Sequence, residues 1–600
     1  MATINTATRK PRGEKVKSGN LKKMISLAVP YKKRFALAML FVILAILAEL
    51  AKPYVMEIVI DEFLTVGTAG SGVFSLTGLA VVYFLLVVID ALSSLLQVRV
   101  VTRTGQQIIH SMRQRVFSHV QHMTLSALDR YSSGRLITRV TNDVETLNEF
   151  YSDVLVNLFR DVFLLIGIII AMLSMNTGLA LVAFAVVPLI FILTFMIRTK
   201  LRNNFTRMKA IIGEINGFFA ENMAGMRIVQ AFNRQREKMR EFRELNDRYF
   251  KTTMVQVVMN SILRPAMEVI NSLAIALLIV YAYNRISGSL LEVGVLYAFT
   301  NYIKQFFNPI NDLAENYTSV QSAMVSADRV YELLEDPAPL EDLEAGSYAE
   351  PVIGTVEFKN VWFAYEGEDW ILRDVSFKVD MGQNVAFVGA TGSGKTTIIN
   401  LISRFYVPQR GEIYIDGIPI GDWKLGTLRR GIAVVMQDVV LFSGTIADNI
   451  RVNDNMGDEE VMEAIRLSMA EEFILSQRDG VHSEVTERGS TFSTGERQLL
   501  SFARAIAHKP SILVLDEATA NIDTNTEAAI QKSIARISQN RTALFIAHRL
   551  STIRSCDQIY VLRRGRIREQ GTHEQLMEAQ GLYYGLYQAQ FLEQEGVRGS

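Results

Sequence analysis

Apolar stretches long enough to cross a lipid bilayer are confined to the first half of this chain of 600 residues. A membrane-spanning helix needs about 20 mostly apolar residues, because the hydrocarbon core of a bilayer is about 30 Å thick. Six stretches qualify, at residues 35–60, 74–101, 154–175, 179–197, 262–283 and 290–307. The last is the weakest, since it contains Glu292 and Lys304. The pattern predicts an all-α membrane domain with six membrane helices.

The charges around these stretches predict how the domain lies in the membrane. Ten lysines and arginines precede or open the first stretch, and two long charged loops, 102–153 and 198–261, lie on the same side. The three loops on the other side contain one basic residue, Arg285. Because basic loops stay in the cytoplasm, we expect a multi-pass protein of the cytoplasmic membrane with both termini in the cytoplasm. The first stretch is too long for a signal peptide and is expected to be retained.

Both cytoplasmic loops are rich in helix-forming residues and poor in glycine and proline. Structureless loops of this length are rare, and each loop can hold an outgoing and a returning helix of about 25 residues. At a rise of 1.5 Å per residue, such helices reach roughly 35–40 Å beyond the bilayer. We therefore expect two helical arms on the cytoplasmic side.

Two carboxylates, Glu49 and Asp90, lie near the middle of apolar stretches. An ionisable group at that depth is costly and usually faces a water-filled cavity or a partner. We expect at least one of the two to face a central aqueous cavity, where it would favour cationic amphiphiles.

The second half of the chain alternates short β-rich runs with helical ones. Seven β-rich runs can be recognised: TVEFKNVWFAY, NVAFVG, GEIYIDG, GIAVVMQ, SILVLDE, TALFIAH and QIYVLRRG. This alternation is typical of an α/β domain with a largely parallel sheet. An acidic, proline-containing segment without hydrophobic periodicity separates the two halves. We predict a membrane domain at residues 1–335, a linker at 336–352 and an α/β domain at 353–600.

The sequence GATGSGKT at residues 389–396 fits the phosphate-binding pattern G-x-x-x-x-G-K-[ST]. It follows the predicted strand NVAFVG and opens the apolar helix TTIINLISRF, which is the context that such a loop requires. Its glycines let backbone N–H groups close on phosphate oxygens at a helix N-terminus. Lys395 would reach the β- and γ-phosphates, and the hydroxyl of Thr396 would bind Mg²⁺.

Other predicted strands end in residues suited to the same ligand: Asp516, Glu517, His548, Gln437 and Tyr365. The carboxyl ends of parallel strands meet at the ligand-binding edge of a sheet. Asp516 would hold Mg²⁺, directly or through water, and Glu517 would polarise an attacking water. His548 is a candidate for a γ-phosphate contact, and Tyr365 could stack on a base.

Taken in order, these motifs resemble the ATPase domain of ABC transporters over about residues 356–586. The resemblance implies a P-loop ATPase that uses ATP and Mg²⁺. It implies that the nucleotide is bound by Tyr365, Thr391, Gly392, Ser393, Gly394, Lys395, Thr396, Thr397, Gln437, Ser493, Gly495 and Asp523. It implies that Mg²⁺ is bound by Thr396, Gln437 and Asp516, and that catalysis uses Lys395, Glu517 and His548.

The first half resembles the six-helix membrane domain of bacterial exporters of the multidrug type. LDRYSSGRLITRVTNDVETL and ENMAGMRIVQAF are similar to the two intracellular loop segments of that family. The resemblance implies short coupling helices near residues 124–132 and 216–226, which dock on ATPase domains. It also implies a half-transporter, because the family works with two membrane domains and two ATPase domains.

The signature position departs from the family's pattern LSGGQ, since residues 492–496 read FSTGE within STFSTGERQ. Ser493 and Gly495 are kept. Thr494 places a Cβ where glycine allows close approach, and Glu496 brings a carboxylate near a triphosphate, which Arg497 could partly neutralise. A complete catalytic set beside an altered signature is the pattern of one half of a heterodimeric exporter. We therefore expect a different half-transporter as partner, with a homodimer as the alternative.

The resemblance implies ATP-driven export of hydrophobic or amphiphilic compounds by a protein in contact with membrane lipids. A homodimeric lipid flippase is a second hypothesis, and an ATP-gated channel or regulatory subunit is a third. The intact Glu517 and His548 disfavour the third, because a gate needs binding more than fast turnover. The formal net charge of +0 gives no reason to expect nucleic acid as a partner.

Overall fold

The computed structural model describes residues 24, 26–65, 75–286, 292–336, 340–452, 454–486, 489–516, 524–546 and 550–589. The chain forms two compact units. The first, which we call the membrane unit, comprises Met1–His119 and Ser133–Asp336. The second, which we call the α/β unit, comprises Val120–Ser132 and Pro337–Ser600, so it includes the tip of the first of the two loops that are predicted to be cytoplasmic.

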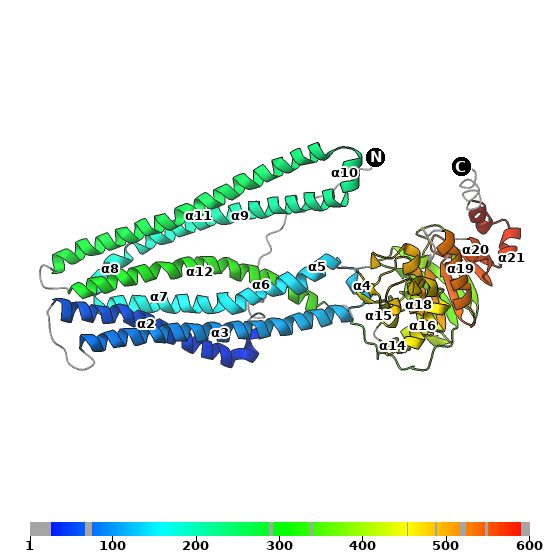
Figure 1. Ribbon diagram of the computed structural model, residues 1–600, viewed down its shortest axis with the longest axis horizontal. Helices are drawn as coiled ribbons and strands as arrows, with labels where there is room; N and C mark the ends of the chain where they lie inside the picture. The colour runs from blue at the N-terminus through cyan, green and yellow to red at the C-terminus, as the bar shows by residue number, and fades with distance from the viewer. Residues whose placement is uncertain are drawn as a thin grey trace. The chain divides into compact units, whose positions relative to one another are not determined.

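The described part of the membrane unit is helical (Figure 1). The long helices are α2 (Lys32–Ile58), α3 (Leu76–His122), α7 (Leu155–Met175), α9 (Val187–Ala224), α11 (Gln235–Ile286) and α12 (Val293–Leu334). Shorter elements are a 3-10 turn (Val29–Tyr31), α5 (Ser133–Thr138), α6 (Val144–Glu149), α8 (Thr177–Phe184) and α10 (Met226–Ala231). Three π-helical turns lie at Val59–Thr65, Arg139–Asp143 and Phe150–Val154. The two long loops, 102–153 and 198–261, are therefore largely helical, as predicted.

Five helical segments among the described residues are long and apolar enough to cross a membrane: Ser26–Leu64, Leu76–His122, Ser133–Met175, Thr177–Ala224 and Gln235–Tyr283. The sixth predicted stretch falls largely in α12, where Lys304 and Gln305 interrupt the apolar pattern. This helix packs against α2 and α7. Polar residues are tolerated there because the helix has protein neighbours, and its crossing of the membrane stays a prediction.

The membrane unit contains an apolar cluster formed mainly by α2, α7, α8, α11 and α12. Ile168 and Phe299 are fully buried in it, and the hydroxyl of Tyr302 donates to the carbonyl oxygen of Leu50 at 2.7 Å. Helices α9 and α11 run side by side toward α10 (Figure 1). Much of the apolar surface of α3 remains exposed, including the side chain of Phe84.

Glu49 and Asp90 each have an ion-pair partner in the same chain. A carboxylate oxygen of Glu49 on α2 lies 3.2 Å from a guanidinium nitrogen of Arg160 on α7. A carboxylate oxygen of Asp90 on α3 lies 2.5 Å from Nζ of Lys52 on α2. A paired carboxylate presents little net charge to a cationic compound. These pairs therefore speak against the prediction that Glu49 or Asp90 favours cationic amphiphiles.

The larger sheet of the α/β unit has the strand order β12-β11-β3-β10-β9-β6. Its neighbouring strands are parallel except for β12, which is antiparallel to β11. The strands are β3 (Asn384–Val388), β6 (Ile432–Val435), β9 (Ile512–Asp516), β10 (Thr542–Ile546), β11 (Gln558–Arg563) and β12 (Arg566–Gly571). The smaller, antiparallel sheet has the order β2-β1-β4-β5. It contains β1 (Val356–Ala364), β2 (Trp370–Val379), β4 (Arg410–Ile415) and β5 (Ile418–Pro419).

All seven predicted runs form strands, and the α/β class is confirmed. Strands β2 and β12 are not among the predictions, because their alternating exposed and buried residues lack a continuous apolar run. Strands β7 (Gly444–Thr445) and β8 (Glu484–Val485) pair as a two-stranded antiparallel ribbon. The described helices of the α/β unit are α4 (Leu125–Leu128), α13 (Lys395–Ile402), α14 (Leu425–Gly431), α15 (Ile446–Arg451), α16 (Asp458–Leu467), α17 (Glu471–Leu475), α18 (Thr494–Ala507), α19 (Thr524–Ile537), α20 (Leu550–Arg554) and α21 (His573–Glu578), with a 3-10 turn at Gly480–His482.

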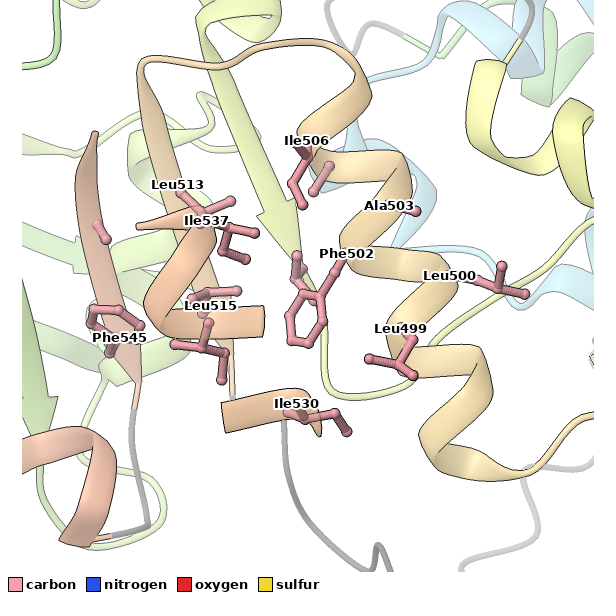
Figure 2. Packing of buried hydrophobic residues seen from close by; sticks show 14 of the residues in the cluster. Leu499, Leu500, Phe502, Ala503, Ile506, Leu513, Leu515, Ile530, Ile537 and Phe545 are labelled. Carbon is pink, nitrogen blue, oxygen red and sulfur yellow. The ribbon is translucent and has the colours of Figure 1, made fainter. Parts of the chain in front are cut away.

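The central strands are buried on both faces, because successive side chains of a strand point in opposite directions. Leu513 and Leu515 of β9 belong to one hydrophobic cluster, and Ile512 and Val514 belong to another. Figure 2 shows Phe502 of α18 pointing toward the strand that carries Leu515. This packing fixes α18 on the sheet. A strand buried on both faces reads as a continuous apolar run, which explains why β9 is recognisable in the sequence.

Residues 340–352, which are predicted as part of a linker, belong to the α/β unit and pack against its other residues. Tyr348 lies edge-on to Trp423, with ring centroids 4.7 Å apart. Glu341 and Arg429 form a bidentate ion pair with both N–O distances at 2.8 Å. These contacts depend on residues distant in the sequence, so local composition does not indicate them.

We expect that removing one partner of the Glu49–Arg160 pair lowers the stability of the membrane unit. Glu49→Gln leaves the guanidinium of Arg160 without its carboxylate in a region of low dielectric. Because the pair is only partly buried, we expect a coupling of about 1–2 kcal/mol. A double-mutant cycle with Glu49→Gln and Arg160→Gln, read as melting temperature in detergent, measures this coupling. Strictly additive losses would contradict a direct interaction.

Candidate nucleotide-binding site

The turn between β3 and α13 has no room for side chains at two glycines. The backbone φ angles of Gly389 and Gly394 are +157° and +104°, values that residues with a Cβ rarely adopt. A Cβ at Gly389 would lie 2.3 Å from the carbonyl oxygen of Leu562. One at Gly394 would lie 2.6 Å from a methyl group of Leu372. Glycine at these positions lets the loop pack tightly and leaves the N-terminal N–H groups of α13 available to an anion.

Polar side chains of this loop are buried around the turn. Nζ of Lys395 donates to the carbonyl oxygens of Gly389 at 2.8 Å and Ala390 at 3.2 Å, which folds the lysine over the loop. The hydroxyl oxygen of Ser393 is buried and has no hydrogen-bond partner in the described part of the chain. A buried polar group without a partner costs free energy, and a phosphate oxygen would accept a hydrogen bond from Ser393. The loop therefore offers a hydroxyl, an ammonium group and backbone N–H groups to a polyphosphate.

Tyr365 follows β1 and lies beside α13. Its hydroxyl oxygen is 3.3 Å from Oγ1 of Thr397 and accepts a hydrogen bond from Nδ2 of Asn400 at 3.1 Å. Tyr365 is 46% exposed, so its ring remains available for stacking. The structure thus brings together an exposed aromatic ring and the phosphate-binding loop, as a nucleotide requires.

Strand order places further predicted residues along the same edge of the sheet. Strands β3, β10, β9 and β6 are consecutive neighbours in the sheet, and these neighbours are parallel, so their carboxyl ends lie along one edge. Asp516 is the last residue of β9 and is in register with Ile546 of β10. Gln437 follows β6 and is exposed. Three predicted site residues lie outside the described residues: Glu517, Asp523 and His548.

The donors suit Mg²⁺ only together with a phosphate. Among the described residues, no group of three or more His, Cys, Asp or Glu side chains is arranged to enclose a metal ion. Mg²⁺ keeps several waters and binds through one or two carboxylates plus substrate phosphates. Thr396, exposed in the first turn of α13, and Asp516, at the end of β9, supply that type of ligand.

The altered signature forms the N-terminus of α18. Ser493 is the N-cap, and its hydroxyl oxygen accepts a hydrogen bond from the N–H of Glu496 at 3.2 Å. The carboxylate of Glu496 accepts one from the N–H of Ser493 at 2.7 Å, which completes a capping box. A negative charge is favourable at this end of a helix. The carboxylate of Glu496 therefore satisfies a donor of its own helix.

Arg497 makes other contacts. Its guanidinium donates to the carbonyl oxygen of Phe492 at 2.7 Å and to Oγ1 of Thr494 at 3.3 Å. Within the described ranges, no ion pair joins Arg497 to Glu496, so the expected neutralisation does not occur in this way. The described hydrogen bonds of Ser493 remain within α18 and do not link the signature to the loop 389–396.

Arg504 of α18, which is absent from the predicted site, bonds to the segment between β6 and α16. Its guanidinium donates to the carbonyl oxygens of Val440 at 3.1 Å and Asn449 at 2.8 Å. These bonds tie the signature helix to the segment that follows Gln437. One arginine among 62 basic residues carries no sequence signal for such a role.

A second unpredicted pair lies just beyond the C-terminal end of α13. Tyr406 is buried, and its hydroxyl donates to the carboxylate of Asp129, which follows α4 in the tip of the first loop. Burial and the hydrogen bond to this carboxylate raise the pKa of Tyr406. The two residues are 277 positions apart, so sequence spacing could not reveal the contact.

Comparisons with known proteins agree with the two units. The family description "ABC transporter transmembrane region" matches residues 35–310, and "ABC transporter" matches residues 372–520. The probable multidrug resistance ABC transporter ATP-binding/permease protein YheH of Bacillus subtilis is 42% identical, covering 81% of this chain and 73% of the relative. The ATP-dependent lipid A-core flippase of Syntrophus aciditrophicus is 33% identical, covering 95% and 94%.

A solved structure is also similar over most of the chain. A bacterial Atm1-family ABC exporter with ATP bound superposes with a TM-score of 0.75 at 28% identity, covering 93% of this chain and 98% of that chain.

We expect Lys395→Ala to abolish ATP turnover and to weaken nucleotide binding by about tenfold or more, because Lys395 is the ammonium group of the phosphate-binding loop. Turnover and fluorescent-nucleotide binding of the purified protein measure the two effects. Lys378→Ala is the matched control, since this exposed lysine pairs with Asp380 and should leave both unchanged. Near-normal turnover in Lys395→Ala would rule out this loop as the catalytic site.

Proposed function

Because the chain belongs to the ABC transporter family, with an exporter-type membrane region fused to an ATPase domain, we propose that it is one half of a dimer that exports hydrophobic or amphiphilic compounds. The main support for this proposal is that one chain contains both a helical membrane unit and a phosphate-binding loop with the buried donors Ser393 and Lys395. ATP hydrolysis would drive alternation between inward-facing and outward-facing states. The protein would lie in the cytoplasmic membrane, in contact with lipids, with both termini in the cytoplasm.

Hydrolysis would depend mainly on positioning and electrostatic stabilisation, since phosphoryl transfer requires little covalent chemistry from the protein. Lys395 and the backbone N–H groups of the loop would hold the β- and γ-phosphates. Glu517 would polarise the attacking water, and His548 would contact the γ-phosphate. Mg²⁺ would be bound by Thr396, Gln437 and Asp516, and Asp523 would contribute from the D-loop.

The tip of the first cytoplasmic loop is partly buried within this chain, whereas the tip of the second is exposed. This difference supports a dimer in which a partner chain covers the second tip. Ala127 of α4 is buried within the α/β unit. By contrast, α10 has no buried residue, and at this second tip Met223, Ile228 and Phe232 are 70%, 65% and 71% exposed. Exposed apolar clusters mark interaction sites. The second tip, with the coupling helix at 216–226, would dock on the ATPase domain of the partner chain.

We favour a different half-transporter as the partner. In this family the signature of one chain grips the γ-phosphate held by the other chain. Here Glu496 satisfies the N–H of Ser493 and adds negative charge where that phosphate would bind. A partner with an intact signature would complete the hydrolysing site on this chain's Walker residues, and this chain's signature would serve a weaker site. A homodimer would place the altered signature in both sites.

A homodimeric lipid flippase is the second candidate, because both multidrug and flippase names occur among similar proteins. The exposed apolar surface of α3 fits contact with lipid or with a second chain. An ATP-gated channel is the least favoured, since the sequence keeps the carboxylate Glu517 and the histidine His548.

The proposed asymmetry predicts different effects for two changes in this chain. Glu517→Gln should nearly abolish ATP turnover of the complex, because it removes the base of the competent site. Thr494→Gly with Glu496→Gln should change turnover little, because the restored signature serves the weaker site. ATPase rates of the complex in proteoliposomes measure both. A several-fold rise in the restored variant would contradict the heterodimer and favour the homodimer.

A further inference from the structure

Helix α13 links the phosphate-binding loop to the residues that hold the tip of the first cytoplasmic loop. The helix begins at Lys395, directly after the glycine turn, and ends at Ile402. Tyr406 follows four residues later, is 9% exposed and donates its hydroxyl hydrogen to the carboxylate of Asp129. The loop tip is therefore anchored to the α/β unit beside the end of the helix that starts at the phosphates.

A second attachment holds the same loop tip. The backbone N–H of Glu341 donates to the carbonyl oxygen of His122 at 2.6 Å, and Met123 forms a bridge with Leu340. The loop tip belongs to the same compact unit as the nucleotide site. Residues 122 and 123 are thus tied to residues 340 and 341, which attaches the segment that carries Asp129 to the rest of the α/β unit at a second point.

The ring of Tyr406 contacts the ring of Tyr365. Their centroids are 5.1 Å apart and their planes are perpendicular, at 90°. Phe363 completes the group, with centroids 4.9 Å from Tyr365 and 5.6 Å from Tyr406. Edge-to-face contacts of this kind are directional, so the position of Tyr406 constrains the position of Tyr365.

Tyr365 is also held from α13, through its hydroxyl contacts with Thr397 and Asn400. The residue as a whole nevertheless remains 46% exposed. The contacts therefore hold the edge and the hydroxyl while leaving ring surface for a base. The stacking of a base on Tyr365 would therefore depend on the position of Tyr406, which in turn depends on the position of Asp129.

We propose that Asp129 and Tyr406 are positioning residues of the base site, which make nucleotide affinity depend on docking of the first cytoplasmic loop. The inference rests on the proposed function of Tyr365 as the residue that stacks on adenine. Coupling of this kind is reciprocal: docking of the loop raises the affinity for ATP, and a bound base stabilises the docked loop. Asp129 bonds to Tyr406, and Tyr406 contacts the rings of Tyr365 and Phe363. None of these described contacts involves residues 389–396, so the coupling acts through the base.

Comparing ATP with inorganic tripolyphosphate, which has no base, tests the proposal in the full-length protein in nanodiscs. Tyr406→Phe removes only the hydroxyl, and Asp129→Ala removes only the acceptor. Both should raise KM for ATP about three- to tenfold, with kcat largely retained, since one stacking contact is weakened. The inhibition constant of magnesium tripolyphosphate against ATP turnover should stay unchanged. Asp129→Asn keeps an acceptor oxygen and should show a smaller effect.

Two control variants separate the possible failures. Gln121→Ala, an exposed change in the segment Val120–Ser132 but outside the predicted coupling helix, should leave KM unchanged. Tyr365→Ala should show the largest rise in KM for ATP. If KM for ATP is normal in Tyr406→Phe but raised in Tyr365→Ala, the proposed role of Asp129 and Tyr406 is wrong, whereas the base site at Tyr365 stands. Equal weakening of ATP and tripolyphosphate would also overturn that role, because the effect would then be structural. Normal KM in Tyr365→Ala would overturn the base site itself.

Discussion

The backbone turn from β3 into α13 depends on glycine at Gly389 and Gly394, and the nucleotide site is arranged around this turn. The carbonyl of Leu562 and the side chain of Leu372 come too close for any other residue. Because the loop packs this tightly, no side chain at these two positions covers the N-terminus of α13, which remains available to an anion. The donors Ser393 and Lys395 are buried beside it. The order of the parallel strands then places Asp516 and the end of β6 along the same edge. Catalysis by positioning requires such a preformed frame.

Helix α13 also connects the nucleotide site to the tip of the first loop. Its first residues form the phosphate loop, its middle contacts Tyr365, and Tyr406 beyond its end holds Asp129 of the first loop. The loop tip is covalently continuous with α3, which carries the second apolar stretch. The second loop tip has an uncovered apolar surface instead, which is consistent with a partner chain completing the assembly.

The sequence was informative wherever function or burial imposes a local pattern. Membrane helices, strands buried on both faces and the phosphate-binding loop each need a particular run of residues, so GATGSGKT and ILVLD could be identified directly. Contacts between distant segments left no such pattern. The pairs Glu49–Arg160 and Asp129–Tyr406, and the packing of Glu341 on Arg429, depend on tertiary structure. The capping box is an intermediate case, since S-x-x-E is a local signal. The difference from LSGGQ indicates the extra charge of Glu496, but it does not indicate that this carboxylate accepts a hydrogen bond from the N–H of Ser493.

We propose that ATP bound at the N-terminus of α13 shifts the membrane helices toward an outward-facing state. Moving such an equilibrium from 1:99 to 99:1 requires about 5.5 kcal/mol of differential binding, which two bound triphosphates could supply. The direct measurement is a spin-label distance between the predicted extracellular ends of the two half-transporters. One label replaces the exposed Leu64, with the single native cysteine, Cys556, changed to serine. In Glu517→Gln with ATP and Mg²⁺, we expect this distance to be longer than without nucleotide. An unchanged distance would contradict it.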